Sequence, residues 1–466
     1  MRLSTFLAVT AALTSAFTFA TAKSLTGDRL LVVLPKADAK STDEYSNFID
    51  SLKGRGFQVA IEAVNAASLK LFSYGERQYD HLILLAPKAK RISPEVNAKT
   101  LIEFLDDGGN LLLTAGTDFG GVQRDFVKQL GVDFDVRGNV VIDHFHYLPL
   151  GPAQLEDEAE THSWLLADNF NANATAIVSD SVRQGAPVLF QGVAHRVLPG
   201  PQTPLVWPVL SGYPTTYSFD TSEGQSVSGK DTVLAAGKLH LVSAFQAHNN
   251  ARVVVAGSPR LFSNTFFQTE LPAGTGSTSN AQVPAGNAKF ADEISAWAFH
   301  EKGVVKLRSV TYHKAGEPVP EKNPASFRVS DDIVYTAELS EYYDDKWHPF
   351  RNDGVQFEAV MIDPYLRKTL PLERTTTITA VYSAALKLPD VYGVFTFKLD
   401  FLRTGLTRVQ QLDIVSILPF KHNDYPRYLT AAFPYYASAA SLMVSFLAFC
   451  AIWLYNRPPV AKSKTG

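Results

Sequence analysis

Hydrophobic and polar positions alternate in two ways along this chain, and the first way occupies its amino-terminal part. Short apolar runs at 29–34 (RLLVVL), 81–86 (HLILLA) and 110–116 (NLLLTAG) are typical of buried strands. After the first run, apolar residues follow the helical spacing i, i+3, i+4, i+7: Tyr45, Phe48, Ile49 and Leu52. Strands that alternate with helices indicate a parallel sheet covered on both faces. We therefore predict an α/β fold, with a flavodoxin-like or Rossmann-like domain over 23–302.

Polar residues and glycines predict where these elements begin and end. Ser41 and Glu44 have the spacing of a capping box at the start of the first helix. Gly54 ends that helix, and the sequence FQVAIE then provides the next strand. A second helix is predicted over 95–106, where a pair of glycines follows it.

The second pattern has period two and follows a predicted helix over 288–301. Large apolar residues alternate with polar ones in 394–401 (VFTFKLDF), and 355–362 (VQFEAVMI) behaves in the same way. This alternation is typical of half-buried antiparallel strands. Prolines and glycines separate the short runs, and a proline-bearing loop is expected at 313–324. We predict a β-sandwich domain over 303–425.

A segment without charged side chains extends from 431 to 456. It is long enough to cross a hydrocarbon core of about 30 Å as a helix, so we predict a transmembrane helix over 432–455. Ala437, Ser441 and Ser445 repeat every four positions and form a small-residue face on which another helix could pack closely. The alternative is that alanine and serine are simply common in such segments.

The amino terminus predicts on which side of the membrane the body lies. Residues 1–22 combine a basic start, an apolar stretch and an A-x-A cleavage site, as in a removable signal peptide. The body is then outside the cytoplasm in type I orientation, with a cytoplasmic tail over 456–466. In that tail, Lys462 and Lys464 have the K-x-K-x-x spacing of a dilysine retrieval signal to the endoplasmic reticulum. The alternative is that the positive-inside rule alone explains the two lysines.

Composition supports a folded body and limits its chemistry. A hydrophobic content of 46%, a charged content of 19% and a net charge of −3 exclude a disordered chain and a nucleic-acid-binding surface. Cys450 is the only cysteine and lies in the apolar segment, which excludes disulfides, thiolate metal sites and a cysteine nucleophile in the body. Asn173, in Asn-Ala-Thr, is the only sequon, and we expect it to accept a glycan.

Nucleotide and hydrolase motifs are missing from the α/β region. The loop after the first strand, 35–39, has no glycine and cannot approach a pyrophosphate as a dinucleotide-binding loop does. The glycines of 116–121 have the wrong spacing for that motif. A G-x-S-x-G nucleophile elbow is also absent from the sequence.

Two histidine segments leave alternatives open. His144 and His146 would share one face of a strand and could bind zinc, but no further ligands complete a motif, so hydrogen-bonded strand or turn histidines are favoured. The segment 248–252 (HNNAR) is either the turn that enters a strand or a polar contact loop. The acidic run 156–160 is expected to be a solvated loop.

Several long segments resemble the 48 kDa subunit family of the eukaryotic oligosaccharyltransferase: 249–267, 386–405 and 425–443. The likeness extends in order over nearly the whole chain. It implies a non-catalytic type I subunit of the endoplasmic reticulum complex that transfers a preassembled oligosaccharide from dolichyl diphosphate to asparagine of N-x-S/T. It also implies partners: a multi-spanning catalytic subunit, a ribophorin-like subunit and a small membrane subunit. No catalytic residue, cofactor or metal site is implied for this chain, and the dilysine tail matches a signal of some members.

The residues themselves favour the same function. Transfer from a lipid pyrophosphate requires a membrane-level cavity with a divalent cation, which one apolar helix without acidic residues cannot build. We therefore expect an accessory subunit whose body positions its partners. One alternative is a carbohydrate-processing enzyme that uses Asp118 and Asp143 at the carboxyl edge of the sheet. Another is a lectin-like or chaperone module that binds glycans outside any transferase.

Overall fold

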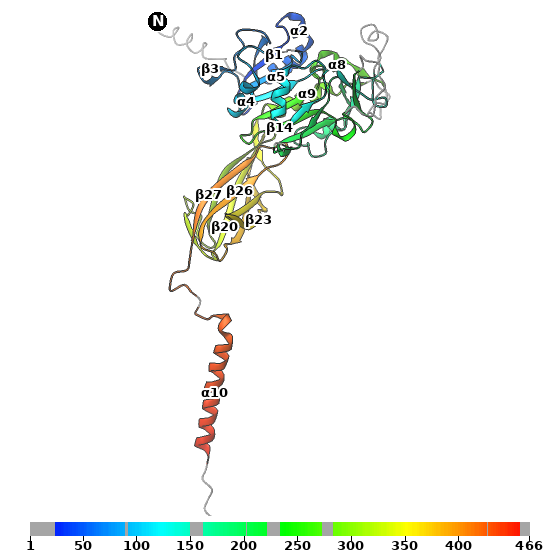
Figure 1. Cartoon of the computed structure of the whole chain (residues 1–466). Helices are drawn as coiled ribbons and strands as arrows, with labels where there is room; N and C mark the ends of the chain where they lie inside the picture. The colour runs from blue at the N-terminus through cyan, green and yellow to red at the C-terminus, as the bar shows by residue number, and fades with distance from the viewer. Residues whose placement is uncertain are drawn as a thin grey trace, which may run out of the picture.

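The computed structural model describes residues 24–88, 92–149, 162–201, 203–220, 234–272, 283–425 and 427–456. Figure 1 shows three parts in chain order, with the helix α10 at the end opposite the amino-terminal part. We call residues 24–302 the α/β unit and residues 304–418 the β unit. The expected signal peptide, the acidic run 156–160, and the tail with Lys462 and Lys464 lie outside the described residues.

The α/β unit is organised around one mixed sheet. Among the described residues this sheet has nine strands in the order β2-β1-β5-β6-β15-β14-β11-β7, and β12 pairs with β14. The pairs from β2 to β15 are parallel, and those beyond β15 are antiparallel. The strands are β1 (Arg29–Leu34), β2 (Gln58–Ala63), β5 (His81–Leu84), β6 (Asn110–Thr114), β7 (Val132–Phe134), β11 (His195–Val197), β12 (Val206–Ser211), β14 (His240–Gln246) and β15 (Arg252–Ala256).

Helices cover both faces of the parallel strands. On β1, Leu30 and Val32 belong to one core cluster and Leu31 and Val33 to another, because successive strand side chains point to opposite faces. The first cluster includes side chains of α3 (Ser46–Gly54) and α9 (Asn287–Ala298), and the second those of α4 (Ala98–Asp106) and α5 (Gly121–Gln129). The predicted α/β class is therefore confirmed.

The start of the first predicted helix differs from the expected capping box. A short helix α2 (Ala39–Glu44) begins at Asp38, whose carboxylate accepts a hydrogen bond from the Ser41 amide at 2.9 Å. Ser41 therefore lies inside this helix and cannot cap it. The chain leaves helical geometry at Tyr45, and α3 begins one residue later. The prediction was wrong because the Asp38 carboxylate caps the helix, through the Ser41 amide.

The β unit consists of two sheets that share one apolar core. In the described part of the chain each sheet has five strands, ordered β18-β20-β25-β24 with β21 on β20, and β19-β27-β26-β22-β23. Their bounds are β18 (Val304–Lys314), β19 (Ser326–Arg328), β20 (Asp332–Tyr343), β21 (Lys346–Pro349), β22 (Gln356–Met361), β23 (Asp363–Thr369), β24 (Leu372–Thr375), β25 (Ala380–Lys387), β26 (Gly393–Phe401) and β27 (Val409–Leu418). On β26, every second residue from Phe395 to Phe401 is buried, which confirms the period-two prediction. Tyr335 of the first sheet contacts Phe357 of the second, with ring centroids 4.5 Å apart.

The remaining elements are short, apart from the terminal helix. They are β3 (Phe72–Ser73), β4 (Glu76–Arg77), β8 (Asn139–Ile142), β9 (Leu165–Ala167), α7 (Asp180–Arg183), β10 (Val188–Phe190), η1 (Thr203–Leu205), β13 (Tyr217–Asp220), η2 (Ala236–Lys238), η3 (Arg260–Phe262), α8 (Asn264–Gln268), β16 (Glu270–Leu271), β17 (Val283–Pro284) and η4 (Thr430–Ala432). The helix α10 (Phe433–Tyr455) confirms the predicted apolar helix, since an 18-residue stretch within Thr430–Tyr455 has a mean hydropathy of 2.0 and is not buried.

Candidate functional site

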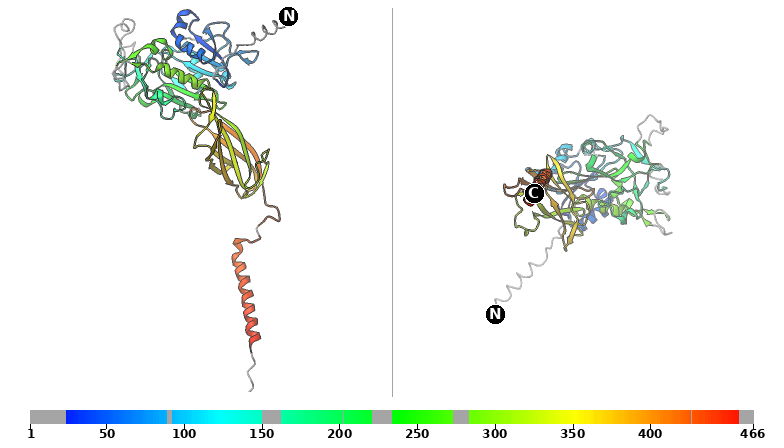
Figure 2. Two further views of the ribbon diagram at one scale, coloured as in Figure 1. Left: turned by 180° about the vertical axis from the view of Figure 1, so that it is seen from behind. Right: turned by 90° about the horizontal axis from the view of Figure 1, so that it is seen from below.

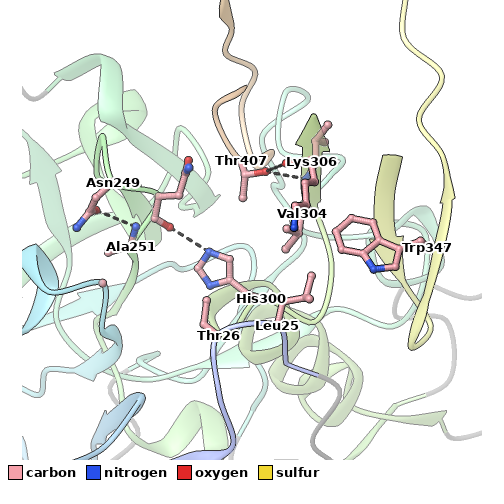
Figure 3. Close-up of a pocket in the computed structure, with 12 residues that line it drawn as sticks. Leu25, Thr26, Asn249, Ala251, His300, Val304, Lys306, Trp347 and Thr407 are labelled. Atoms are coloured by element: carbon pink, nitrogen blue, oxygen red, sulfur yellow. Dashed lines mark hydrogen bonds between the residues drawn. The ribbon is translucent and has the colours of Figure 1, made fainter. Parts of the chain in front are cut away.

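The α/β unit and the β unit meet at a seam that contains a pocket of about 370 Å³. Figure 3 shows side chains from both units around it. Lining residues used below are Asn249, Asn250, His300, Val305, Trp347 and Thr407. The seam is therefore the place to ask whether this chain carries chemistry or holds its two units together.

Arg252, the first residue of β15, lies fully buried at the seam. Its guanidinium donates to the carbonyl oxygens of Trp297 at 2.7 Å, Lys302 at 2.8 Å and Gly303 at 2.7 Å. These carbonyls include the carboxyl end of α9, where the helix dipole favours a cation. The guanidinium also lies 4.8 Å from the Trp297 ring centroid. Burial lowers the pKa of Arg252 to about 9, so it stays charged at neutral pH.

The β unit contributes a loop that closes on α9. The Trp297 indole Nε1 donates to the Gly405 carbonyl oxygen at 2.7 Å. Gly303 has a φ of +68°, and a Cβ there would lie 2.6 Å from the same Gly405 oxygen. Thr407 of this loop accepts from the Val305 amide at 2.7 Å and donates to the Val305 oxygen at 2.8 Å. Close backbone approach at Gly303 therefore fixes how the β unit leaves the α/β unit.

The HNNAR segment is the turn between β14 and β15, and it also contacts the β unit. Asn250 adopts a φ of +70°, and its side chain accepts from the Arg408 amide at 2.7 Å and donates to the Arg408 oxygen at 3.3 Å. Asn249 instead binds the end of α4, where its Nδ2 donates to the Leu105 oxygen at 2.7 Å. Both interpretations left open by the sequence are therefore correct: the segment is the turn that leads into β15, and it is also a polar loop that contacts the β unit.

Two buried histidines, His300 at the seam and His81 inside the α/β unit, are held in their neutral forms. Burial lowers the pKa of His300 well below its usual value, and that of His81 to about 4. The His300 Nε2 lies 3.0 Å from the Asn250 carbonyl oxygen, so this nitrogen carries the proton and donates. His81 Nε2 lies 3.1 Å from the Gly27 carbonyl oxygen, and its other nitrogen lies 3.2 Å from the Asn110 amide nitrogen.

Most polar atoms of the seam bind other atoms of the seam. The Asn249, Asn250, Thr407 and Arg252 side chains all bind backbone groups of the chain itself. Within the described ranges, no group of three or more His, Cys, Asp or Glu side chains could hold a metal ion. The Asn250–Arg408 and Trp297–Gly405 hydrogen bonds cross between the two units and join them.

The two acidic residues of the enzyme alternative occupy different environments. Asp143 is fully buried and accepts hydrogen bonds from the Phe145 amide and from the Thr215 and Thr216 hydroxyls, each at 2.8 Å. Burial alone would raise the pKa of Asp143, but these hydrogen bonds lower it below its usual value. Asp118 is exposed, with its carboxylate 3.9 Å from the Lys88 ammonium. Asp143 is thus held as a buried anion by its hydrogen bonds. Asp118, in contrast, lies on the surface beside Lys88.

The H-x-H pair lies in a bend and not in a strand. His144 Nε2 lies 2.9 Å from the Tyr217 hydroxyl, and the His146 ring stacks on Tyr213 with centroids 3.8 Å apart. These are hydrogen-bonded or stacked turn histidines, the interpretation that the sequence favoured over zinc.

Sequence reasoning missed the residues that build the seam: Arg252, Trp297, His300, Gly303 and Gly405. The one available signal was an arginine at the start of a fully apolar strand (RVVVAG), where a charge needs a buried partner. The partners, however, lie 45 to 51 residues further along the chain.

Comparisons with known proteins agree with one another over nearly the whole chain. Family models described as OST48, N-terminal domain, and OST48 middle domain match residues 21–301 and 312–457. The dolichyl-diphosphooligosaccharide–protein glycosyltransferase subunit wbp1 of Schizosaccharomyces pombe is 36% identical over 422 residues, covering 90% of this chain and 91% of the relative. The corresponding 48 kDa subunits of Caenorhabditis elegans and Danio rerio are 35% and 37% identical, each with 93% of both chains covered.

A solved structure of a putative ThuA-like protein from Parabacteroides merdae shares 13% identity, over 63% of this chain and 94% of that chain. Its TM-score of 0.27 carries no argument about the fold. The sequence relatives and both family models show instead that the chain belongs to the OST48 family, that of the 48 kDa subunit of dolichyl-diphosphooligosaccharide–protein glycosyltransferase.

Proposed function

We propose that this chain is a non-catalytic, accessory subunit of an oligosaccharyltransferase complex. The relatives are named as subunits of that glycosyltransferase. The observation that carries the non-catalytic part is the seam, where the polar side chains of Trp297 and Asn250 are engaged in joining the two units, through hydrogen bonds with Gly405 and Arg408. The chain would thus support the transfer of a preassembled glycan from dolichyl diphosphate to asparagine of N-x-S/T, with the chemistry performed by another subunit.

The finer fold assignment is part of this proposal. The parallel strands β2-β1-β5-β6-β15 follow the chain order 2-1-3-4-5, which is the flavodoxin-like order. The two sheets of the β unit face each other across one shared apolar core, as in a β-sandwich. For the domain limits we keep those of the sequence prediction, 23–302 and 303–425.

A location in the endoplasmic reticulum membrane completes the proposal, with single-pass type I orientation and the body in the lumen. The exposed, apolar α10 supports the membrane span. Asn173 lies in an exposed turn, where a lumenal transferase could reach it. Retrieval through Lys462 and Lys464 remains a prediction of the sequence.

For partners, we expect the multi-spanning catalytic subunit, a ribophorin-like subunit and a small membrane subunit. Ala437, Ser441 and Ser445 lie on one side of α10, at intervals of four residues, and are exposed. In a membrane, small side chains let helix backbones approach closely. This face is therefore the proposed contact of α10 with another membrane helix.

The test is purification of the tagged full chain in mild detergent. The recovered material is assayed for transfer from a dolichyl-linked oligosaccharide to an N-x-T peptide, and its proteins are identified. We expect activity together with a multi-spanning partner, and we expect Ala437→Leu with Ser441→Leu to reduce recovery of both. Ala439→Leu with Met443→Leu, on the opposite side of α10, is the matched control. An eluate without partners or activity, while the unbound fraction keeps the transferase, would refute the proposed function.

A further inference from the structure

The loops of the β unit gather at the end that faces α10. The Leu388 amide donates to the Asp331 oxygen at 2.9 Å, and the Val329 amide donates to the Leu418 oxygen at 2.9 Å. A Cβ on Gly393 would lie 2.5 Å from the Met361 sulfur, which places the β22–β23 bend beside these loops. We call this end, residues 329–331, 361–363, 388–392 and 418–425, the foot. Figures 1 and 2 show it between the rest of the β unit and α10.

The foot exposes large apolar and aromatic side chains at its tips. Ile362 is 98% exposed, Tyr392 is 68% exposed and Leu418 is 50% exposed. Ile362 also has a φ of +66°, a conformation that is strained for a β-branched residue. A strained and fully exposed isoleucine does not contribute to the core, so its position calls for an external partner.

Contacts on both sides leave only a short connection between the foot and α10. On the foot side, Asp424 pairs with Arg328, and the Phe420 and Tyr425 rings are 5.7 Å apart. On the helix side, the Tyr428 ring stacks on Tyr436 with centroids 4.9 Å apart. Only three peptide steps separate Tyr425 from Tyr428, and they span at most about 11 Å. The foot therefore stays close to the first turn of α10.

The first turn of α10 also indicates the level of the membrane surface. Tyr435 and Tyr436 lie there, and tyrosine rings prefer the headgroup region. That region is roughly 5–8 Å thick on each side of the hydrocarbon core. Tyr425 of the foot lies at most about 11 Å from Tyr428, and the Tyr428 ring stacks on Tyr436, so this part of the foot lies near the level of the headgroups.

We infer that the foot docks on the lumenal surface of the bilayer, with Ile362 and Tyr392 immersed among the lipid headgroups. This inference rests on the proposed anchoring of the chain by α10. Tip side chains of this kind fit a lipid surface, since an isoleucine can enter its apolar margin and a tyrosine can keep its hydroxyl in water. The contact would hold the lumenal body at a fixed height and tilt above the membrane.

The test uses the full chain with Cys450→Ser, reconstituted in phosphatidylcholine vesicles. Ile362→Cys and Tyr392→Cys are labelled with a nitrobenzoxadiazole fluorophore, and the vesicles carry or lack headgroup-attached nitroxide lipids. We expect a blue-shifted emission at both positions and a loss of emission with nitroxide. Ile414→Cys is the matched control, an isoleucine that is 73% exposed on the side of the β unit, and it should keep its emission. Urea unfolding of each labelled variant confirms that it is folded.

Tyr435→Cys at the start of α10 separates the two proposals. Quenching at 435 without quenching at 362 and 392 would overturn the docking of the foot and leave the anchoring intact. No quenching at 435 would overturn the anchoring and the docking with it. A blue shift at 362 that needs the other subunits and resists nitroxide would overturn the lipid contact in favour of a protein contact.

Discussion

At the scale of single residues, Arg252 shows how a buried charge can serve a joint. A lone buried cation is expensive unless its donors are satisfied. Here Nη1 and Nη2 donate to three carbonyl oxygens and the guanidinium lies over the Trp297 ring, while Nε has no hydrogen-bond partner among the described residues. Two of these carbonyls belong to the connection between the two units, so their geometry depends on the guanidinium. The planar fork of arginine matches such a cluster in a way that a lysine ammonium does not.

Arg252→Lys should therefore lower the free energy of unfolding by about 2–4 kcal/mol, because hydrogen bonds to charged groups contribute about 1.5–3 kcal/mol each and lysine cannot reach all three oxygens. Urea unfolding followed by tryptophan fluorescence measures this change. Arg308→Lys is the control, since Arg308 lies exposed over Trp347 and should change stability by less than about 1 kcal/mol. Equal effects of the two substitutions would contradict the assigned role.

The buried histidines predict the pH dependence of stability. Burial lowers the pKa of His81 to about 4 and of His195 to about 3, and it lowers the pKa of His300 well below its usual value. The unfolded chain protonates these rings below about pH 6.5, and the folded chain does not. The unfolded state thus binds more protons between about pH 6.5 and 4, so stability must fall as the pH falls through this window.

The expected slope is about 1.4 kcal/mol per pH unit for each histidine, measured as urea midpoints between pH 7.5 and 4.5. His81→Asn should reduce the slope by the contribution of one histidine, about 1.4 kcal/mol per pH unit, because asparagine cannot take up the proton. His422→Asn, at an exposed position, should leave it unchanged. A stability that is flat over this window would show that these rings are not neutral in the folded protein.

At the scale of elements, the spacing of apolar residues in the sequence predicted most of the strands and helices that it can specify locally. The parallel strands, the alternation on β26 and the apolar α10 all follow from side-chain period. The break between α2 and α3 could not be predicted from side-chain period, because it depends on Asp38 capping α2 while Tyr45 is buried in the core. The partners of Arg252 in the seam could not be predicted, since Arg252 meets its carbonyl oxygens only through the tertiary fold.

Gly303 offers a test of the element connection from α9 to β18. Gly303→Ala should be strongly destabilising, because it combines a positive φ with a Cβ 2.6 Å from a backbone oxygen. Gly316→Ala measures the cost of a positive φ alone, since Gly316 has a φ of +87° and nothing lies within 4 Å of a Cβ there. The control should cost about 1–2 kcal/mol of unfolding free energy, and Gly303→Ala distinctly more. Thermal unfolding compares the two variants. Equal losses of stability would show that the close approach of Gly303 to the Gly405 oxygen does not cause the destabilisation.

The turn at 171–175 carries a prediction about modification. Asn173 and Thr175 are exposed, so the sequon is accessible if the body is lumenal. Treatment of the full chain with an endoglycosidase should increase its electrophoretic mobility, and Asn173→Gln should abolish that change. Asn171→Gln alters the same turn, where Asn171 accepts from the Asn173 amide, and should keep the glycan. A wild-type chain whose mobility the enzyme does not alter would contradict the prediction.

At the scale of the whole molecule, two connections with defined contacts link the α/β unit, the β unit and α10. Hydrogen bonds of Trp297 with Gly405 and of Asn250 with Arg408 fix the α/β unit on the β unit. The Arg328–Asp424 and Tyr428–Tyr436 contacts fix both ends of the connection to α10. A body joined in this way can hold partners at a defined height above a membrane, which a body on a loose tether cannot do. Stiffness of the connections is therefore as much a part of the proposed accessory role as the surfaces themselves.

Lengthening the second joint tests this argument directly. Insertion of about 12 Gly and Ser residues between Tyr425 and Tyr428 would add roughly 20 Å of flexible reach and separate the foot from α10. Because α10 is unchanged, we expect the multi-spanning partner to be recovered as before. Peptide glycosylation by the purified complex should fall, and the nitroxide quenching at 362 and 392 should weaken. An insertion of the same length in the exposed loop at Gly316 is the control, since it leaves both joints intact. Undiminished glycosylation and quenching with the lengthened joint would mean that the body finds its position through its partners, and that the short connection has no role in holding it.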